Sequence, residues 1–333
     1  MSSPFGFVDL QVNGHKGIHF SSPTLTLDQI RIATLELDRI GTVAFCPTIV
    51  TGPLSVFERN LALFATAMQE PDLKPHLLGL HLEGPFISPK EGARGAHPLE
   101  HIRAPSVEIF KQFQAWSGGH ISILTLAPEE EGALDLIRYA SRQGTVVSLG
   151  HHLAEDDAMA RAVDAGARLC THLGNGMPGT ISRHQNPLWW QLAEDRLTGM
   201  FITDGHHIPA DYIKVALRAK TLDRALVVSD ATDLAGMPPG RYDFQGTYVI
   251  LASNGRISFG DTPYLAGASA TLTQCMNHLA SLDLLTEAEL WKLGYHNPLR
   301  MLGLAAKGFT PGVQTRVGFK KGKFELTAGD RAG

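Results

Sequence analysis

The feature that most constrains the fold of this chain is a regular alternation of short apolar segments with amphipathic ones. Runs of strand length, apolar on both faces, occupy 7–13, 42–48, 77–84, 121–128, 145–151, 167–175, 198–205 and 225–231. Segments with helical spacing lie between them, at 27–41, 55–69, 130–144, 155–167 and 210–220. Strands that are buried on both faces and alternate with helices indicate a parallel sheet. Eight such units predict an α/β fold, the (β/α)8 TIM barrel.

A doubly wound open sheet is the alternative arrangement of the same units. Such sheets bind a dinucleotide through a glycine-rich turn after their first strand. No glycine-rich fingerprint of that kind follows the run at 7–13. The closed barrel is therefore the better prediction.

The pattern changes after residue 240. Residues 241–260 alternate apolar and polar positions, with a hairpin signal at Asn254-Gly255, and a second hairpin at 313–326 is expected to turn at Lys321-Gly322. We expect these segments to form a small β appendage and not an independent catalytic domain. The predicted division is a barrel made of 1–240 and 263–307, with an appendage made of 241–262 and 308–333.

Composition excludes several classes of function. The net charge is −4, and lysine and arginine are spread along the 333 residues without a basic stripe, so nucleic acid is not an expected partner. No apolar run approaches the roughly 20 residues that a membrane span needs, so no membrane partner is expected. The three cysteines are dispersed and odd in number, which favours a reducing, cytoplasmic location.

Side chains that commonly bind metals end several of the apolar runs. In a parallel barrel the carboxyl ends of the strands meet at one mouth. Glu83, His151 and His172 would supply there the histidine and carboxylate set that a hydrolytic divalent metal requires. Asp230 would lie beside them as a proton shuttle. Spacing alone leaves a structural role open, because a strand-end histidine is more often simply hydrogen-bonded.

Eight ordered motifs add to this interpretation: FVDLQVNGHKG (7–17), HLEGPFISPKEGARGAH (81–97), LAPE (126–129), GHH (150–152), THLGNGM (171–177), DGHHI (204–208), SDATDLAGMPPGRY (229–242) and LAGASATL (265–272). Their order, from about residue 6 to about residue 305, resembles the N-acetylglucosamine-6-phosphate deacetylases of the amidohydrolase superfamily. The resemblance implies a metal-dependent amide hydrolase that removes the acetyl group from N-acetylglucosamine-6-phosphate, giving glucosamine-6-phosphate and acetate.

The resemblance also implies roles for individual residues. Glu83, His151 and His172 match the family's metal ligands, and Asp230 matches its catalytic acid and base. His97 matches a residue near the reacting amide. One divalent ion is expected; zinc is the first choice, with iron, manganese and cobalt as alternatives.

Further matches concern the substrate. The residues that match substrate contacts of the family are Gln11, Asn175, Gly176 (through its backbone), Arg183 and His207. Gln11 and Asn13 stand where other amidohydrolases have a His-x-His pair, which argues against a second metal ion. Some family contacts come from a neighbouring subunit, so a homodimer is implied.

The chain departs from the family pattern at several places. Gly174 replaces the usual aromatic residue, which predicts a wider sugar site, and the loop 92–97 is longer than usual. The family has a longer segment before its first strand, which forms half of a small β-sandwich, so we expect a reduced sandwich here.

Two other functions remain open from the sequence. The protein could be a deacetylase of another N-acetylated sugar, or a different amidohydrolase. It could also be a non-catalytic protein that binds sugar phosphates. A proton shuttle beside a metal site argues against the second alternative, since binding alone does not require one.

Overall fold

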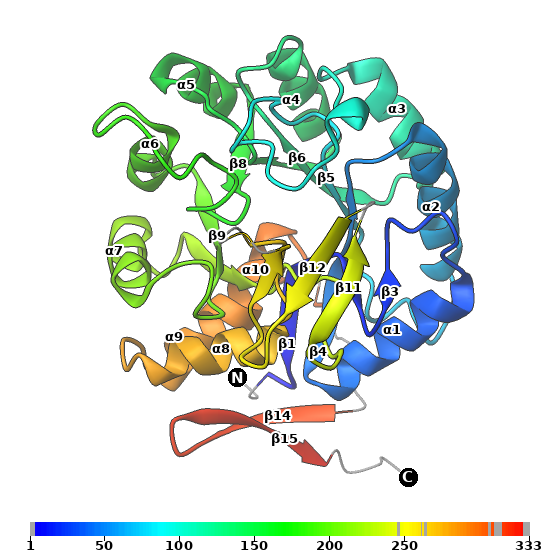
Figure 1. Ribbon diagram of the computed structural model, residues 1–333, viewed down its shortest axis with the longest axis vertical. Helices are drawn as coiled ribbons and strands as arrows, with labels where there is room; N and C mark the ends of the chain where they lie inside the picture. Colours follow the sequence, from blue (N-terminus) through cyan, green and yellow to red (C-terminus); the bar gives the residue numbers. More distant parts are fainter. Residues whose placement is uncertain are drawn as a thin grey trace.

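The central element of the fold is a ring of eight parallel strands surrounded by helices (Figure 1). The structure is a computed structural model that describes residues 4–244, 247–260, 262, 265–305, 308–309 and 315–328. The strands pair in the order β1 (Phe7–Val12), β4 (Thr42–Val50), β5 (Leu80–Glu83), β6 (Ile121–Leu126), β7 (Val146–Leu149), β8 (Ala167–Cys170), β9 (Thr198–Ile202) and β10 (Ala225–Val228). Each predicted run overlaps one of them, β4 extending two residues beyond its run, and the TIM barrel is confirmed.

The last strand returns to the first one at the carboxyl end of the barrel. The backbone N–H of Asp230 donates to the carbonyl of Gln11 at 3.0 Å, and that of Asn13 donates to the carbonyl of Ala231 at 2.7 Å. These hydrogen bonds join the residues that follow β10 to β1. We call this contact between β1 and the residues after β10 the seam of the barrel. The closure of the barrel therefore holds the polar side chains at the seam in place.

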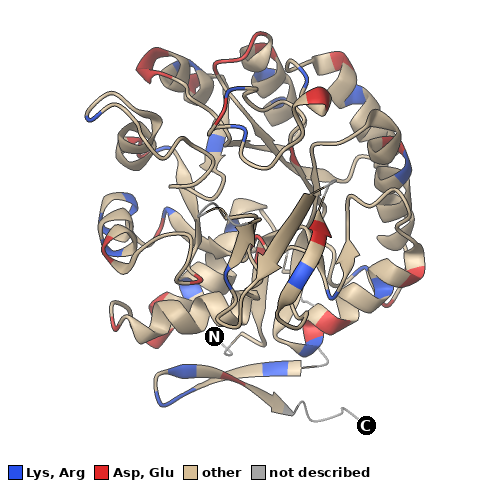
Figure 2. Cartoon of the chain, in the orientation of Figure 1, with Lys and Arg blue, Asp and Glu red and all other residues tan. Residues whose placement is uncertain are grey.

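Helices cover the outside of the ring. They are α1 (Leu27–Arg39), α2 (Leu54–Ala67), η1 (Leu99–His101), α3 (Val107–Trp116), α4 (Ala133–Arg142), α5 (Asp156–Ala165), α6 (Pro187–Ala193), α7 (Ala210–Lys220), α8 (Leu272–Ser281), α9 (Glu287–Trp291), η2 (Lys292–His296) and α10 (Asn297–Met301). Capping boxes begin α1, α8 and α9, where a threonine and a residue three positions later exchange hydrogen bonds with the backbone. Most charged side chains lie on these helices and on the loops (Figure 2).

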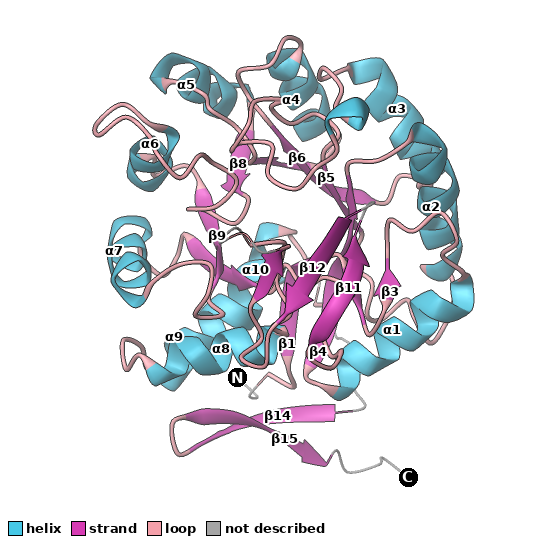
Figure 3. Cartoon of the chain, in the orientation of Figure 1, coloured by secondary structure: helices cyan, strands magenta, loops and turns pink. Residues whose placement is uncertain are grey.

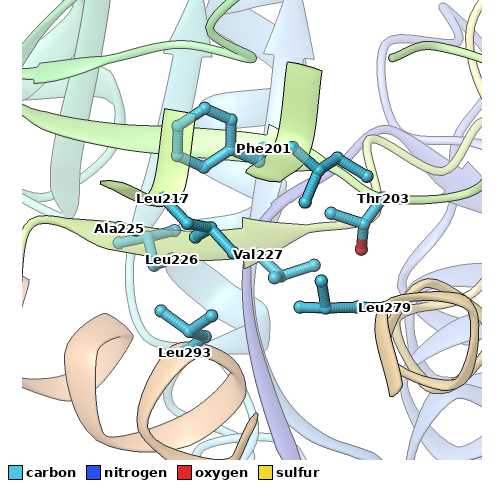
Figure 4. Close-up of a pocket in the computed structure, with 9 residues that line it drawn as sticks. Phe201, Thr203, Leu217, Ala225, Leu226, Val227, Leu279 and Leu293 are labelled. Carbon is cyan, nitrogen blue, oxygen red and sulfur yellow. The ribbon is translucent and has the colours of Figure 1, made fainter. Parts of the chain in front are cut away.

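Apolar side chains fill the space on both sides of the strands. Inside the ring, Leu10, Ile123 and Leu169 belong to one buried cluster, and outside it Phe45, Leu82 and other residues pack against the helices. A small void of about 10 Å³ lies between β9, β10, α7, α8 and η2 and is lined almost wholly by apolar groups. Figure 4 shows the side chains that line it. A void of this size holds at most one water molecule, so it is a gap in packing and not a binding site.

Three small sheets accompany the barrel in the described residues (Figure 3). The first is an antiparallel meander of β11 (Gly240–Phe244), β12 (Thr247–Leu251) and β13 (Ile257–Phe259). The segment expected as one hairpin therefore has three strands, because β12 pairs antiparallel with both β11 and β13. The alternation of apolar and polar residues is the same in both arrangements, so it could not show the extra strand.

The second sheet is the hairpin of β14 (Thr315–Lys320) and β15 (Lys323–Ala328), which turns at Lys321-Gly322 as expected. Its Phe324 ring lies 4.9 Å from the rings of Phe7 and Trp291, so this hairpin packs on the barrel. A two-stranded pair, β2 (Gly14–His15) and β3 (Ile18–His19), follows β1.

The predicted division at 1–240, 241–262, 263–307 and 308–333 stays a prediction. The parts of it that fall on 1–3, 245–246, 261, 263–264, 306–307, 310–314 and 329–333 lie outside the described residues. None of the described helices is both long enough and apolar enough to cross a lipid bilayer.

Candidate active site

Three predicted metal ligands meet at the carboxyl end of the barrel. Glu83 ends β5, while His151 and His172 each stand two residues beyond the ends of β7 and β8. The Oε1 atom of Glu83 lies 3.1 Å from Nε2 of His151 and 2.8 Å from Nε2 of His172, and the two nitrogen atoms are 3.0 Å apart. All three residues are buried. The barrel thus brings together side chains from three separate strands.

The chemistry of this cluster fits a divalent cation. Nδ1 of His151 lies 2.9 Å from the carbonyl oxygen of Ala93, which can only accept, so Nδ1 carries a proton and Nε2 is the ring atom that faces Glu83. Burial raises the pKa of Glu83, but its hydrogen bonds with the two imidazoles outweigh this and hold the pKa well below its usual value. A carboxylate oxygen beside two imidazole Nε2 atoms is a donor set that suits a divalent cation. Atoms that bind one tetrahedral zinc ion at about 2.1 Å lie about 3.4 Å apart, close to the separations found here.

The backbone at these positions is unusual. His151, His172 and Asp230 have φ angles of 53°, 30° and 51°, in the left-handed region that residues other than glycine avoid. Each stands just after a barrel strand, where the chain turns away from the sheet. Such conformations cost about 1–3 kcal/mol each and cluster at functional sites. This is a second, independent indication that the ends of these strands form the active site.

His97 lies beside the cluster. Ligand atoms of Glu83, His97 and His151 all fall within 4.8 Å of one another, and the ring centres of His97 and His151 are 4.4 Å apart. His172 lies 2.8 Å from Glu83 and 3.0 Å from His151, so it stays the predicted third ligand. Burial lowers the pKa of His97 to about 3, so its ring is neutral, and its Nδ1 lies 2.9 Å from the hydroxyl of Thr51.

Asp230 is held by two amides from the first strand segment. Its Oδ1 accepts hydrogen bonds from Nε2 of Gln11 at 2.9 Å and from Nδ2 of Asn13 at 2.7 Å. Burial of the carboxyl group, and then the negative charge of Glu83, raise the pKa of Asp230 to about 8. A carboxyl group whose pKa is shifted toward neutral pH suits the role of an acid and base in catalysis.

Two of the predicted substrate residues lie against the cluster. The backbone N–H of Asn175 donates to the carbonyl of His172 at 2.9 Å. Gly176 has a φ angle of 63°, and a side chain there would come within 3.0 Å of the His172 ring and 3.1 Å of the His151 ring. Only glycine lets the chain pass this close to both histidines, which explains its presence at 176.

Two further predicted substrate residues, Arg183 and His207, stand apart from the cluster. Arg183 is exposed on the loop between β8 and α6, where its carbonyl accepts from the indole of Trp189 at 3.1 Å. Nδ1 of His207 donates to Asp204 at 2.8 Å. Among the described residues, no hydrogen bond or ion pair connects either side chain to Glu83, His151 or His172.

The wider sugar site expected at Gly174 stays a prediction. A side chain at 174 would lie 2.9 Å from the hydroxyl oxygen of Tyr212 on α7, so the ring of Tyr212 occupies the space beside Gly174. Sequence reasoning missed the carbonyl of Ala93 and the hydroxyl of Thr51. A backbone carbonyl has no sequence signal, and contacts of Thr51 and Tyr212 depend on loops and helices distant in the chain.

Comparison with known proteins extends these findings. No family model matches the chain. It is 31% identical, over 91% of its length and 77% of the relative's, to the N-acetylglucosamine-6-phosphate deacetylase of Lysinibacillus sphaericus. It is 33% identical, over 90% of its length and 77% of the relative's, to the N-acetylgalactosamine-6-phosphate deacetylase of Escherichia coli O157:H7.

A solved structure agrees with these relatives. The structure of N-acetyl-D-glucosamine-6-phosphate deacetylase from Mycobacterium smegmatis superposes with a TM-score of 0.85 at 27% identity, covering 97% of this chain and 84% of that one. The chain therefore belongs to the N-acetylglucosamine-6-phosphate deacetylase family of the amidohydrolase superfamily.

Proposed function

We propose that this protein hydrolyses the acetamide bond of N-acetylglucosamine-6-phosphate, giving glucosamine-6-phosphate and acetate. The observation that carries the proposal is the convergence of Glu83, His151 and His172 within 3.1 Å, with the acid Asp230 at the same end of the barrel. Membership of the deacetylase family supports the choice of reaction.

Glu83, His151 and His172 would hold one divalent ion, for which we propose zinc, with iron, manganese and cobalt as alternatives. A bound divalent ion activates water and polarises an amide carbonyl. Gln11 and Asn13 support a single ion, because their amides are engaged with Asp230 in place of a pair of histidine ligands.

Asp230 moves the proton. Both amide donors bind its Oδ1 atom, which leaves Oδ2 to exchange a proton with water and with the substrate. In its ionised form Asp230 takes a proton from the attacking water and then delivers it to the sugar nitrogen as the carbon–nitrogen bond breaks. Water and the amide are thereby converted to acetate and an amine, with no net change in the protonation of Asp230.

His97 is proposed to stabilise the carbonyl oxygen. If the Thr51 hydroxyl donates to Nδ1, the neutral ring of His97 carries its proton on Nε2. A donor at that position can bind the oxygen atom that becomes negatively charged during attack.

Asn175, the N–H of Gly176, Arg183 and His207 are proposed to bind the sugar phosphate, and Gln11 to lie beside the sugar. A guanidinium suits phosphate oxygens because it donates two parallel hydrogen bonds. Arg183 is exposed and unconnected to the cluster of its own chain, which supports its reaching the site of a neighbouring subunit in a homodimer. The three cysteines are free and buried, which supports a reducing, cytoplasmic location.

Acetate release from a panel of sugars tests the proposal. We expect turnover of N-acetylglucosamine-6-phosphate and much weaker turnover of N-acetylglucosamine. The 6-phosphate of N-acetylgalactosamine is the second candidate, because a relative of similar identity is named for it. Binding of either sugar phosphate without any acetate release would contradict the proposal and favour a protein that only binds.

A further inference from the structure

A chain of buried polar side chains lies beneath the proposed metal ligands. Nδ1 of His81 is 3.0 Å from the carbonyl oxygen of Leu10, and its Nε2 is 2.7 Å from the hydroxyl of Thr125. That hydroxyl is 2.6 Å from the hydroxyl of Thr171, which is 2.6 Å from that of Ser148. All four polar side chains are buried. These side chains belong to β5, β6 and β7 and to the residue that follows β8.

The hydrogen bonds of this chain can run in only one direction. The carbonyl of Leu10 can only accept, so Nδ1 of His81 donates to it. No carboxylate contacts the His81 ring among the described residues, and a buried imidazolium without such a partner is costly, so the ring is neutral and Nε2 accepts. Thr125 must then donate to His81, Thr171 to Thr125, and Ser148 to Thr171, because each hydroxyl has one proton.

Three of the four hydrogen-bonded side chains lie close to a proposed metal ligand in the sequence. His81 stands two residues before Glu83, and side chains two apart on a strand face the same side. Thr171 immediately precedes His172, and Ser148 is on the strand that leads to His151. Strand β6 carries no proposed ligand, but Thr125 on it connects the strand of Glu83 to that of His172.

We propose that His81 is a positioning residue that anchors this one-directional chain, and that the chain fixes the strand ends carrying Glu83, His151 and His172. The part that concerns metal affinity rests on the proposed function, whereas the direction of the chain does not. Loss of the Thr125 or Thr171 hydroxyl removes a hydrogen-bond donor from the residue before it in the series and an acceptor from the residue after it. Loss of the Ser148 hydroxyl removes only the hydrogen bond to Thr171, and the protons of Thr171 and Thr125 keep their acceptors.

Nitrogen-15 NMR of the histidine rings tests the direction in the full-length protein without added metal, with His81→Gln to assign the signals. We expect a neutral His81 ring protonated at Nδ1. A ring protonated at Nε2, or at both nitrogen atoms, would overturn the proposed direction. This result is independent of metal binding.

Chelator competition for Zn²⁺ tests the positioning role. Thr125→Val and Thr171→Val should weaken Zn²⁺ binding by about 10- to 100-fold, and Thr125→Ser should restore it. Ser148→Ala should weaken Zn²⁺ binding by less than about threefold, since this substitution leaves no buried donor without an acceptor. The matched control is Thr203→Val. This substitution removes a buried hydroxyl that donates to the carbonyl of Cys275 and takes no part in the hydrogen bonds between His81 and Ser148.

The outcomes separate the two proposals. Equal Zn²⁺ affinity in Thr125→Val, Thr171→Val and Thr203→Val would overturn the positioning role. An effect of Ser148→Ala as large as that of Thr171→Val would overturn the direction. Failure of the wild-type protein to bind Zn²⁺ or another divalent ion would overturn the proposed function, while the NMR result on His81 would still decide the direction of the chain.

Discussion

The side-chain amide of Asn13 donates a 2.7 Å hydrogen bond to Oδ1 of Asp230, across the seam where the barrel closes. Gln11 donates to the same oxygen atom at 2.9 Å. The first strand segment therefore orients an acid that follows the last strand, although more than 200 residues separate them. Closure of the barrel and placement of the proposed proton shuttle depend on the same contact region.

Removing one of these amides should slow catalysis without abolishing metal binding. Hydrogen bonds to charged groups contribute about 1.5–3 kcal/mol, so Asn13→Ala should lower kcat by about 10- to 100-fold with little change in KM. Steady-state kinetics with N-acetylglucosamine-6-phosphate measure this. Asn60→Ala is the control, because that buried amide bonds the carbonyls of Phe20 and Ser22 and the guanidinium of Arg59, outside the proposed site, and should affect stability alone.

Asp230→Asn should remove proton transfer and leave the rest of the site in place. The asparagine fills the same space but cannot accept the proton of water, so kcat should fall by about 10²- to 10⁴-fold. Elemental analysis should find the same metal content as in the wild type. Turnover close to that of the wild-type protein would show that Asp230 is not the acid and base.

Arg183→Ala should affect only phosphorylated substrates. Loss of a guanidinium bound to phosphate should raise KM for the sugar phosphate by about tenfold or more and leave KM for the unphosphorylated sugar unchanged. Arg142→Ala, which removes another exposed arginine on α4, is the matched control. An equal effect of Arg183→Ala on both sugars would contradict the assignment of this residue to the phosphate.

Stability should depend on pH through Asp9, which is buried beneath the seam. Burial raises its pKa from 3.8 to about 7. The folded state favours the protonated acid, so its contribution is fully present below pH 3.8 and is lost as the pH rises through about 7. Relative to Asp9→Asn, which stays neutral, the wild type should lose about 3 kcal/mol of unfolding free energy between pH 5 and pH 8. Urea unfolding at both pH values measures this, and parallel curves for the two proteins would refute it.

The sequence predicted the barrel and its central cluster for a physical reason. Strands buried on both faces and alternating with helices have few alternative arrangements, and a closed barrel places every strand end at one mouth. Glu83, His151 and His172 could therefore be brought together without knowledge of any loop.

Other features depended on contacts that no local pattern encodes. The Ala93 carbonyl that orients His151 is a backbone atom of a loop, and the Tyr212 ring that occupies the space beside Gly174 comes from a helix that lies after the next strand. The third strand of the outer meander was missed because alternation alone does not locate each turn. The roles of Arg183 and His207 depend on loop positions that spacing does not determine.

Metal content measured by elemental analysis tests most directly whether strand ends far apart in sequence bind one cation. The variants are Glu83→Gln, His151→Ala and His172→Ala, with His76→Asn as the control because Nδ1 of this buried histidine bonds the Val43 carbonyl outside the cluster. The account predicts one divalent ion per chain in the wild type and the control, and less than about a tenth of that in each of the three variants. A full equivalent of metal retained in all three variants would contradict it.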